Sequence, residues 1–386
     1  MRYLNHFFQI LLRCIIILIP RNKKLVVYGG ALDLFIDNAK YMYIYSNDTL
    51  KDYKHIWLTN NDDTYNKIKE IGLSVVKSYS LKGLFYSLRA NTYVYDDDIS
   101  FFSRCIFSTG AKKIQLWHGI PLKMCGIVRD EKPIPYYYKN WLFDTIIYHH
   151  KTGNFIISTS SKFDIIMSRS MRVPIDNVIH ATYPRTIITI MPEDKRIEFL
   201  KKYEDSNLNR LYQELSLEEK RKVIYMPTFR DSNENYLVEA IPDWENLNSF
   251  CERNKIMLYV KVHRMTPIPN VCFSNVKVLD NKLDIYPILP LFDMLITDYS
   301  SIILDFILLK KPVCLYIYDL ENYIANSRDL RHEYFEVKKH LPVARDFSEL
   351  KDCILSENIN ISEFPINDYY EWPDSMDNIY RVICKS

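Results

Sequence analysis

Glycine is scarce in this chain and is missing from its C-terminal part. There are only eight glycines among 386 residues, and the last one is Gly153. A Walker loop and a GxGxxG dinucleotide turn both need glycines, because the backbone must approach the phosphates closely. These two motifs are therefore excluded. If the C-terminal half binds phosphate, it must do so with side chains and helix N-termini.

Paired cysteines are absent as well. None of the eight cysteines is close enough to another to form a CxxC motif, so the sequence indicates neither a zinc site nor a redox pair. In a chain of this length we expect them to stay reduced, which indicates the cytoplasm. A metal-binding DxD cluster is not evident either, because the one candidate, residues 96–98, reads as a turn at the end of a strand. We expect no metal and no cofactor.

An excess of either charge is also missing. The chain has 50 Lys plus Arg and 48 Asp plus Glu, which argues against a nucleic-acid partner bound by a basic field. With 48% hydrophobic and 14% aromatic residues, the composition is that of a packed globule. A length of 386 residues predicts two domains, each large enough to bury its own core.

The N-terminal segment, residues 1–24, predicts an amphipathic helix. Its polar stripe would contain Arg2, His6, Gln9 and Arg13. The apolar run that follows ends at Pro20 and is too short to span a bilayer, and no small-residue cleavage site follows it. We favour a helix lying on the membrane surface, over one packed on the protein's own first domain and over a signal anchor. Basic residues facing the headgroups would be Arg13, Arg21, Lys23 and Lys24.

The rest of the chain alternates short β-branched or aromatic runs with helical stretches. The runs cover residues 25–29, 55–59, 73–76, 92–96, 114–119, 145–150 and 155–160, and then 222–229, 256–263, 276–280, 294–300 and 312–319. Helical patterns occur at 37–48 and 82–90, and a polar helical stretch at 191–221 separates the two groups of strands. This alternation predicts an α/β fold with two doubly wound parallel sheets, joined near residue 190.

Polar residues follow several of these apolar strands, where open α/β sheets bind their ligands. In LWHGIPLK, residues 116–123, His118 stands beside Gly119 at a predicted strand end. A histidine there is suited to act as a general base, because its pKa lies near neutrality. The alternative is a histidine packed against Trp117.

Two further segments combine donors for an anion. YMPTFRD, residues 225–231, contains the hydroxyl of Thr228 and the guanidinium of Arg230, which suits phosphate or pairs with Asp231. YVKVHR, residues 259–264, ends in His263 and Arg264, which could bind a diphosphate. Neither segment would be decisive alone.

The segment LITDYSSIILDFILLKKP, residues 295–312, is the most informative. A buried strand leads through Asp298 to Ser300 and Ser301, and a helix begins at once. A serine near the N-cap, with unpaired backbone N–H groups beside it, favours an anion, although serine is also an ordinary cap. The acids and aromatics of residues 316–336 would suit a ribose and a base, or a capped surface helix.

In this order the segments resemble the CDP-glycerol glycerophosphotransferase family of teichoic-acid and capsule synthesis. The resemblance covers DNAKY at 37–41 and most of the chain from 114 to 342. Its most specific parts are WHGIPLK, PTFRD and LITDYSSIILDF with the following KPV and YDLENY. It implies a GT-B-like fold, with an acceptor-side domain at 25–190, a CDP-donor-binding domain at 191–386 and a cleft between them. The last helix would pack back on the first domain.

The resemblance also implies a reaction in which an acceptor hydroxyl attacks the β-phosphate of a CDP-polyol and CMP leaves. His118 would be the base, and His263 would stabilise the diphosphate. Phosphate oxygens would be held by Thr228, Arg230, His263, Arg264, Ser300 and Ser301. Asp298 would order the loop, and Glu321 or Glu336 would contact the ribose. Cationic groups and a helix N-terminus can stabilise such a transition state without a metal.

Two departures from the family pattern concern the donor. Arg264 stands where the family usually has proline, and Arg331, His332 and Glu333 replace an Arg-Gly-aromatic segment. We expect CDP-glycerol as the donor, with CDP-ribitol or another CDP-activated polyol as the alternative. The resemblance also implies that the acceptor is a lipid-linked saccharide at the cytoplasmic membrane surface. The length suits a primase-like enzyme that adds one or a few units, with a compact capsule polymerase as the alternative. The alternatives are a GT-B glycosyltransferase that uses a nucleotide sugar, and a membrane-associated scaffold with a decayed site.

Overall fold

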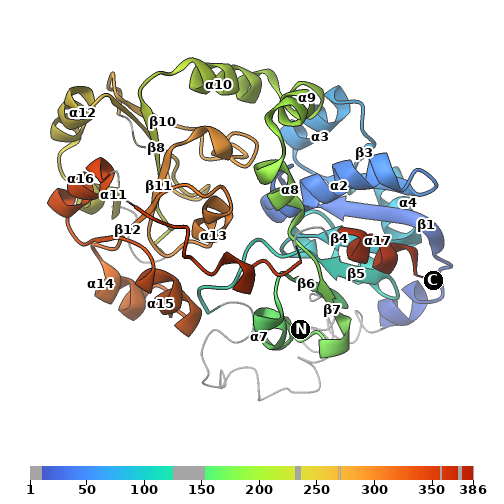
Figure 1. Ribbon diagram of the computed structural model, residues 1–386. Coiled ribbons are helices and arrows are strands. Elements are labelled where there is room, and N and C mark those ends of the chain that lie inside the picture. Colours follow the sequence, from blue (N-terminus) through green and yellow to red (C-terminus); the bar gives the residue numbers. More distant parts are fainter. Residues whose placement is uncertain are drawn as a thin grey trace, which may run out of the picture. The chain divides into compact units, whose positions relative to one another are not determined.

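The computed structural model describes residues 11–124, 153–230, 236–267, 269, 271–356, 359–372 and 376–385. The chain divides into two compact units, each with its own parallel sheet (Figure 1). Unit 1 contains Met1–His118, Gly126–Ile187 and Asn367–Ser386, and unit 2 contains Gly119–Cys125 and Ile188–Ile366. The predicted α/β class with two parallel sheets is confirmed.

Unit 1 contains a seven-stranded parallel sheet in the order β3-β2-β1-β4-β5-β6-β7. Its strands are β1 (Asn22–Gly29), β2 (Lys54–Thr59), β3 (Val75–Lys77), β4 (Ala90–Tyr95), β5 (Lys112–Gln115), β6 (Phe155–Ser158) and β7 (Val178–His180). Its helices are α2 (Asp37–Thr49), α3 (Asp62–Glu70), α4 (Leu81–Arg89), α7 (Asp164–Met171) and α17 (Met376–Cys384). The central strands are buried on both faces, which explains their continuous apolar runs.

Unit 2 contains a six-stranded parallel sheet in the order β10-β9-β8-β11-β12-β13. Its strands are β8 (Arg221–Met226), β9 (Ile256–Val260), β10 (Val276–Val278), β11 (Met294–Thr297), β12 (Val313–Tyr316) and β13 (Val343–Ala344). Its helices are α9 (Glu193–Tyr203), α10 (Ser206–Leu217), α11 (Tyr236–Ala240), α12 (Trp244–Arg253), α13 (Ile302–Ile307), α14 (Leu320–Asn326), α15 (His332–Lys339) and α16 (Phe347–Leu355). Helix α8 (Pro184–Ile190) spans the boundary between the units.

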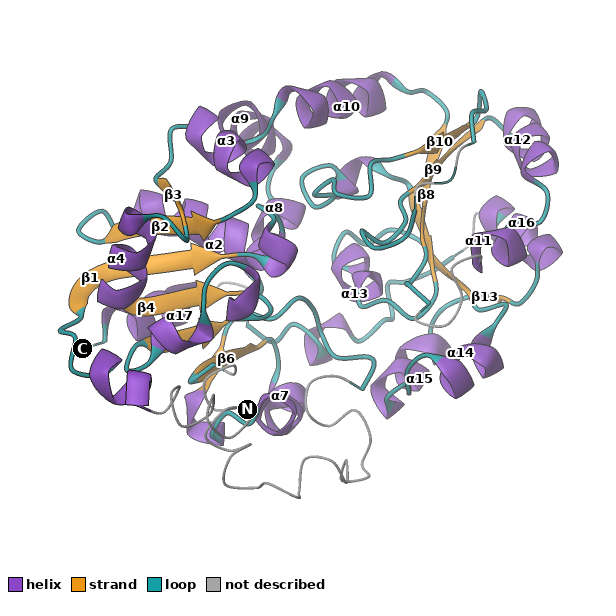
Figure 2. Ribbon diagram, turned by 180° about the vertical axis from the view of Figure 1, so that it is seen from behind, coloured by secondary structure: helices purple, strands orange, loops and turns teal. Residues whose placement is uncertain are grey.

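The unit 2 sheet is covered on both faces. Figure 2 shows it edge-on, with α11, α12 and α16 on one side and α13 on the other. The first three helices share one apolar core with β8, β9 and β12, represented by Tyr236, Leu247 and Leu350. Helix α12 begins where the sequence provides a cap, since the Asp243 carboxylate accepts a hydrogen bond from the Asn246 N–H at 2.9 Å.

Both sheets have the order typical of doubly wound folds, in which the chain starts in the middle and reverses direction once. The reversal lies between β1 and β4 in unit 1 and between β8 and β11 in unit 2. Ligands of such folds bind at the carboxyl ends of the strands at this point. In unit 2 a ligand is therefore expected beside the residues that follow β8 and β11.

Two short strands were not anticipated from the sequence. β7 has three residues and β13 has two, so neither produces a periodic signal that can be read from the sequence. The strand predicted at 145–150 lies outside the described residues. The alternation of strands and helices elsewhere agrees with the prediction.

The N-terminal helix is shorter than predicted at its C-terminal end. Residues 11–16 are helical, residues 1–10 lie outside the described part, and β1 already begins at Asn22, so the helix predicted to reach residue 24 is wrong there. Leu11, Ile15 and Leu18 are exposed, whereas Ile16 is buried. None of the helices in the described residues is long and apolar enough to cross a bilayer.

Arg21 does not face solvent as the membrane interpretation expected. Its guanidinium donates to four backbone carbonyls of unit 1, those of Ser87, Ala90, Phe107 and Thr109. The arginine therefore fastens the start of β1 to the chain around α4. This corrects its assignment to the headgroup-facing set, because a side chain with four internal acceptors is already satisfied.

We expect Arg21→Ala to lower the free energy of unfolding by about 1.5–3 kcal/mol, because carbonyls bonded to a charged donor would lose it. Chemical denaturation measures this. The control is Lys24→Ala, at an exposed position in β1 three residues later, which should change stability by less than about 0.5 kcal/mol. Equal effects of the two substitutions would contradict the structural role of Arg21.

Candidate active site

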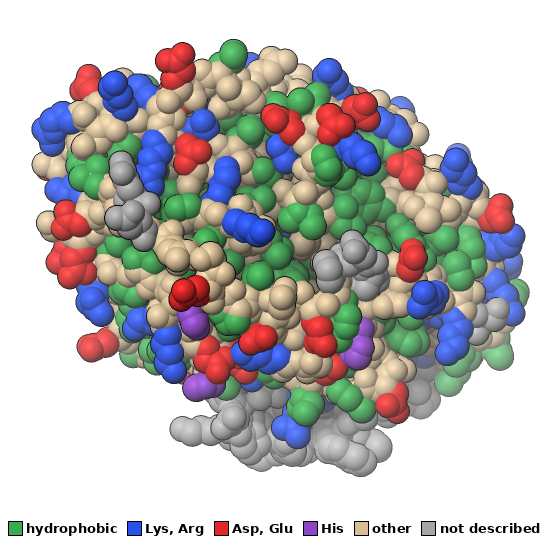
Figure 3. All heavy atoms as spheres, viewed as in Figure 1, with side chains coloured by type: hydrophobic (Ala, Val, Ile, Leu, Met, Phe, Trp, Pro, Cys, Tyr) green, Lys and Arg blue, Asp and Glu red, His purple; other side chains and the backbone are tan. Residues whose placement is uncertain are grey.

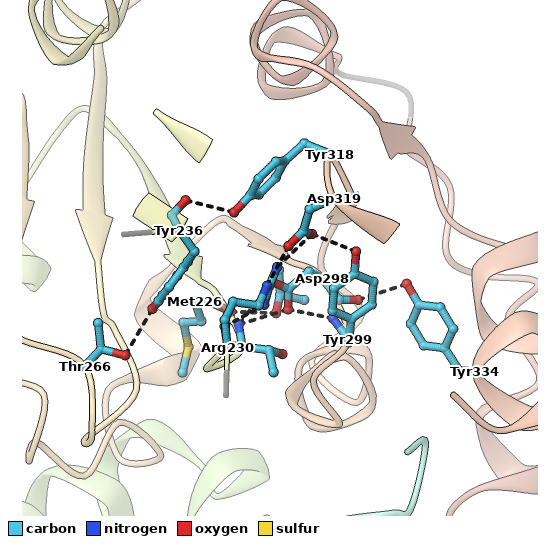
Figure 4. Close-up of polar contacts among 11 residues, drawn as sticks. Met226, Arg230, Tyr236, Thr266, Asp298, Tyr299, Tyr318, Asp319 and Tyr334 are labelled. Atoms are coloured by element: carbon cyan, nitrogen blue, oxygen red, sulfur yellow. Dashed lines mark hydrogen bonds and ion pairs between the residues drawn. The ribbon is translucent and has the colours of Figure 1, made fainter. Parts of the chain in front are cut away.

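A buried ion cluster lies at the strand-order reversal of unit 2 (Figure 4). The Arg230 guanidinium donates from Nη2 to Asp298 at 2.9 Å and from Nε to Asp319 at 2.7 Å. The side chains of Arg230 and Asp298 are 2% and 0% exposed, and that of Asp319 is 9% exposed. Arg230 follows β8, Asp298 follows β11, and Asp319 precedes α14, so one cation joins three separate segments.

The electrostatics of this cluster keep Arg230 charged. Burial alone would lower the pKa of Arg230, but the carboxylates of Asp298 and Asp319 outweigh it and raise the pKa above its ordinary value. Three tyrosine rings lie within cation–π range of the guanidinium, at 5.4 Å for Tyr236, 5.0 Å for Tyr299 and 4.9 Å for Tyr323. The positive charge of Arg230 thus contacts two carboxylates and the faces of three tyrosine rings.

The same cluster fixes the loop that leads into α13. The Asp298 carboxylate accepts from the backbone N–H groups of Thr228, at 2.9 Å, and Tyr299, at 2.6 Å. The Tyr299 hydroxyl donates to Asp319 at 2.9 Å, and the Tyr334 hydroxyl donates to the Asp298 carbonyl at 3.2 Å (Figure 4). These bonds hold the backbone on both sides of Asp298. The loop is therefore rigid at the point where Ser300 and Ser301 begin.

The two serines and Thr228 present hydroxyls near this loop. Ser300 and Ser301 are half-buried and immediately precede α13, and Ser301 makes no capping hydrogen bond with its side chain. The Thr228 hydroxyl is buried, and none of the described residues accepts from it or donates to it. A buried hydroxyl without a partner is costly unless a ligand supplies one. Thr228 is thus well suited to contact a bound group.

Arg230 has a different setting from the one the sequence led us to expect. Its guanidinium makes two bonds to Asp319, one to Asp298 and one to the Thr228 carbonyl, which occupies four of its five N–H groups. Only one N–H group, on Nη1, is left for a phosphate unless the anion displaces a carboxylate or the Thr228 carbonyl. The geometry makes Arg230 an organiser of the loop.

A second group of residues, the cationic cluster, acts electrostatically on His263, which follows β9 by three residues. It consists of Lys123, Lys261, Arg264 and Arg328, whose charges act on the histidine together. Burial first, and these four cations after it, lower the pKa of His263 to about 3. His263 Nδ1 accepts from the Met265 N–H at 3.3 Å, so Nε2 carries the proton and is a hydrogen-bond donor.

The cationic cluster and the ion cluster are neighbours in unit 2. Strands β9, β8 and β11 are adjacent in the sheet, and their carboxyl ends lead to His263, Thr228 and Ser300 respectively. The His263 ring lies 5.5 Å from that of Phe229, the residue between Thr228 and Arg230. Three strands that are adjacent in the sheet therefore bring cations, a neutral histidine and hydroxyls to its carboxyl edge.

The sequence did not identify Lys123 and Arg328 as members of this site. Lys123 forms an antiparallel bridge with Leu330. Two backbone hydrogen bonds flank it, both of 3.0 Å: the Met124 N–H donates to the Asp329 carbonyl, and the Arg331 N–H donates to the Leu122 carbonyl. This pairing joins the end of WHGIPLK to a segment about 200 residues later. No local pattern predicts such a contact.

The two glutamates expected at the ribose lie on helices α14 and α15. Glu321 is exposed, and Glu336 pairs with His332 at 3.3 Å, one turn away on α15. The acid of this region that belongs to the ion cluster is Asp319, which no sequence pattern singles out.

His118 lies in unit 1, just after β5. Trp117 adopts a left-handed backbone with φ of 56°, and Gly119 has φ of 140°, so the chain turns sharply around the histidine. Such a conformation costs a residue other than glycine about 1–2 kcal/mol. His118 Nδ1 lies 3.4 Å from the Asp96 carbonyl, which can only accept, so Nε2 is left unprotonated. The ring also packs on Trp117, with 4.0 Å between the two ring centroids. The packing expected as the alternative to catalysis is thus compatible with a tautomer that can act as a base.

The acidic run at 96–98 makes a structural contact through Asp96. The Asp96 carboxylate is buried and accepts from the backbone N–H of Ala31 at 2.7 Å. In the described part of the chain, no group of three or more His, Cys, Asp or Glu side chains is arranged to hold a metal.

Comparison with known proteins identifies relatives of this chain. A family model described as CDP-Glycerol:Poly(glycerophosphate) glycerophosphotransferase matches residues 11–363. A teichoic acid poly(glycerol phosphate) polymerase of Bacillus spizizenii is 27% identical over 347 residues, 85% of this chain and 82% of the relative. A teichoic acid ribitol-phosphate polymerase of Staphylococcus aureus, TarK, is 27% identical over 291 residues, 72% of this chain and 52% of the relative. The solved structure of the wall teichoic acid polymerase TagF superposes with a TM-score of 0.75 at 19% identity, covering 99% of this chain and 96% of that one.

We expect Arg230→Ala to lower the free energy of unfolding by about 3–5 kcal/mol, because it leaves two buried carboxylates without their cation. The matched control is Arg210→Ala, which removes an exposed arginine from a pair with Glu214 on α10 and should cost less than about 1 kcal/mol. Urea denaturation measures both. A loss for Arg230→Ala no larger than that of the control would refute the organising role of the ion cluster.

The low pKa of His263 predicts an acid-dependent loss of stability. Below pH 6.5, the ordinary pKa of histidine, the unfolded chain binds a proton that the folded chain does not bind until the pH approaches 3. From pH 6.5 to pH 5.5 the wild type should therefore lose about 1 kcal/mol more than His263→Gln. Urea denaturation at the two pH values gives this difference. Equal losses would show that His263 is not held neutral.

Proposed function

Because this chain belongs to the CDP-glycerol:poly(glycerophosphate) glycerophosphotransferase family, we propose that it transfers a polyol phosphate, with glycerol phosphate favoured, from a CDP-polyol to an acceptor hydroxyl. CMP would be released. We further propose that the acceptor is a lipid-linked saccharide and that the enzyme works at the cytoplasmic face of the membrane in teichoic-acid or capsule synthesis. The exposed apolar residues Leu11, Ile15 and Leu18 support the membrane part of this proposal.

The observation that carries the proposal is the carboxyl edge of β9, β8 and β11. A donor diphosphate is anionic, and the cationic cluster around His263 offers the opposite charge. Hydroxyls of Thr228, Ser300 and Ser301 and the Nε2–H of His263 would bind phosphate oxygens through directed hydrogen bonds. This arrangement does without the glycines that other phosphate loops require.

The chemistry follows from the donor's structure. The acceptor oxygen forms a bond to the β-phosphorus, and the bond between that phosphorus and the bridging oxygen breaks. The electron pair goes to the departing CMP, and the hydroxyl proton goes to the unprotonated Nε2 of His118, the base that the family resemblance implies. The cationic cluster would stabilise the negative charge on the phosphate oxygens and the leaving group.

The other residues take supporting roles in this proposal. Asp298, with Arg230 and Asp319, would hold the donor loop in place, so we now assign Arg230 to positioning in place of phosphate binding. Arg264, whose Nη1 is buried without a hydrogen-bond partner among the described residues, would contact the diphosphate. Glu321 or Glu336 would contact the ribose.

Thermal shift with nucleotides tests the donor class without requiring the acceptor. We expect CDP-glycerol or CDP-ribitol, at about 100 times the dissociation constant, to stabilise the protein by about 2.7 kcal/mol, roughly 3 °C in melting temperature. CMP should give a smaller shift, and UDP-glucose and UDP-N-acetylglucosamine none. A shift with a UDP-sugar alone would overturn the reaction in favour of a GT-B glycosyltransferase.

A pair of isosteric variants locates the response. Thr228→Val removes only the hydroxyl without a partner, and it should abolish or reduce the shift with CDP-glycerol. Thr64→Val removes a buried hydroxyl in unit 1, which donates to the Asp33 carbonyl at 2.9 Å, and should leave the shift unchanged. Equal shifts in Thr228→Val and the wild type would place the donor elsewhere.

A further inference from the structure

The first turn of helix α2 contacts the turn that carries His118. The Asn38 side chain is fully buried, and its Nδ2 donates to the Trp117 carbonyl at 2.8 Å. Its Oδ1 accepts from the Arg185 N–H at 3.1 Å. Both ends of one amide are therefore used, and Asn38 can hold this position in only one orientation.

Arg185, in α8, contacts the same turn one residue later. Its Nη1 donates to the His118 carbonyl at 2.8 Å and to the Asp37 carboxylate at 2.8 Å. The Arg185 side chain is 2% exposed and that of Asp37 is 12% exposed, so the ion pair is shielded from solvent. Asn38 and Arg185 thus donate to the carbonyls of two consecutive residues, Trp117 and His118, which flank the His118 side chain along the backbone.

The backbone held by these bonds would not adopt its conformation unaided. Trp117 has φ of 56° and Asp37 has φ of 61°, both in the left-handed region that side chains other than glycine disfavour. Such residues persist only where the surroundings fix them, and they cluster at functional sites. The bonds from Asn38 and Arg185 supply that constraint from two different helices.

We propose that Asn38 and Arg185, the latter oriented by Asp37, are positioning residues for His118. They hold the Trp117–His118 turn so that Nδ1 faces the Asp96 carbonyl and Nε2 is the nitrogen that takes the acceptor's proton. This rests on the proposed function, in which His118 is the base. All the contacts lie within unit 1, whereas the proposed donor-binding residues lie in unit 2.

The proposal predicts that turnover and donor binding separate. Without the Asn38 amide, Trp117 can return toward negative φ and carry the imidazole with it. Misplacement of a catalytic group by an ångström costs up to about a hundredfold in rate. We therefore expect Asn38→Ala to lower kcat by about tenfold to a hundredfold. The dissociation constant for CDP-glycerol should stay within about twofold of the wild type.

The matched control lies on the same helix. Asn47 also donates from Nδ2 to a carbonyl at 2.8 Å, but that carbonyl belongs to Tyr43 of α2 itself. Incorporation of labelled glycerol from CDP-glycerol into bacterial membranes gives kcat, and calorimetric titration gives donor affinity. Asn47→Ala should keep wild-type kcat. If Asn38→Ala loses no more kcat than Asn47→Ala, the positioning role is refuted.

Arg185→Lys and His118→Ala complete the design. Arg185→Lys keeps a cation beside Asp37 but loses the guanidinium geometry, so kcat should fall while the fold and the donor affinity stay as in the wild type. A wild-type kcat in this variant would contradict the role of Arg185. This test holds even if Asn38→Ala does not fold. Full turnover by His118→Ala would instead refute the assignment of the base. An inactive His118→Ala together with active Asn38 and Arg185 variants would refute only the positioning.

Discussion

The arrangement of unit 2 depends on one buried cation between two carboxylates. Arg230 lies 68 residues from Asp298 and 89 residues from Asp319 along the chain, yet it bonds both within 3.0 Å. Burying these charges is costly, and only mutual pairing offsets the loss of water. The pairing in turn requires the ends of β8 and β11 and the start of α14 to meet. The loop that presents Ser300 and Ser301 is consequently fixed before any ligand arrives.

The phosphate site that we propose can do without glycine because of this rigidity. Glycine loops let the backbone wrap an anion. In the proposed site the positive charges would come from the cationic cluster, and hydroxyls would come from the residues that follow β8 and β11. Figure 3 shows acidic and basic side chains intermixed over the viewed face, in keeping with the near-neutral charge balance. Attraction for an anion therefore arises from local placement, as around His263, and does not need a net positive protein.

Much of the fold could be predicted from the sequence, because apolar strands followed by helices leave a strong periodic signal. The fold class was predicted in this way, and the family was predicted from the resemblance carried by WHGIPLK, PTFRD and LITDYSSIILDF. What could not be predicted depends on contacts between distant segments. The bonds from Arg230 to Asp319, on which we base its proposed positioning role, join residues 89 apart in the chain. Arg21 was expected at the headgroups because its four carbonyl acceptors cannot be read from the sequence. Lys123 and Arg328 carry no local signal, since the bridge to Leu330 alone brings their segments together.

The most direct test of this account is a calorimetric titration of CDP-glycerol into Asp319→Asn. The substitution keeps the shape of the side chain but removes one charge from the buried cluster, at a residue that the proposed mechanism does not place on the donor. We predict a folded protein, by circular dichroism, whose dissociation constant for CDP-glycerol is about tenfold weaker, a loss of about 1.4 kcal/mol. Donor binding as tight as in the wild type would contradict the claim that the Arg230 cluster holds the donor loop in place.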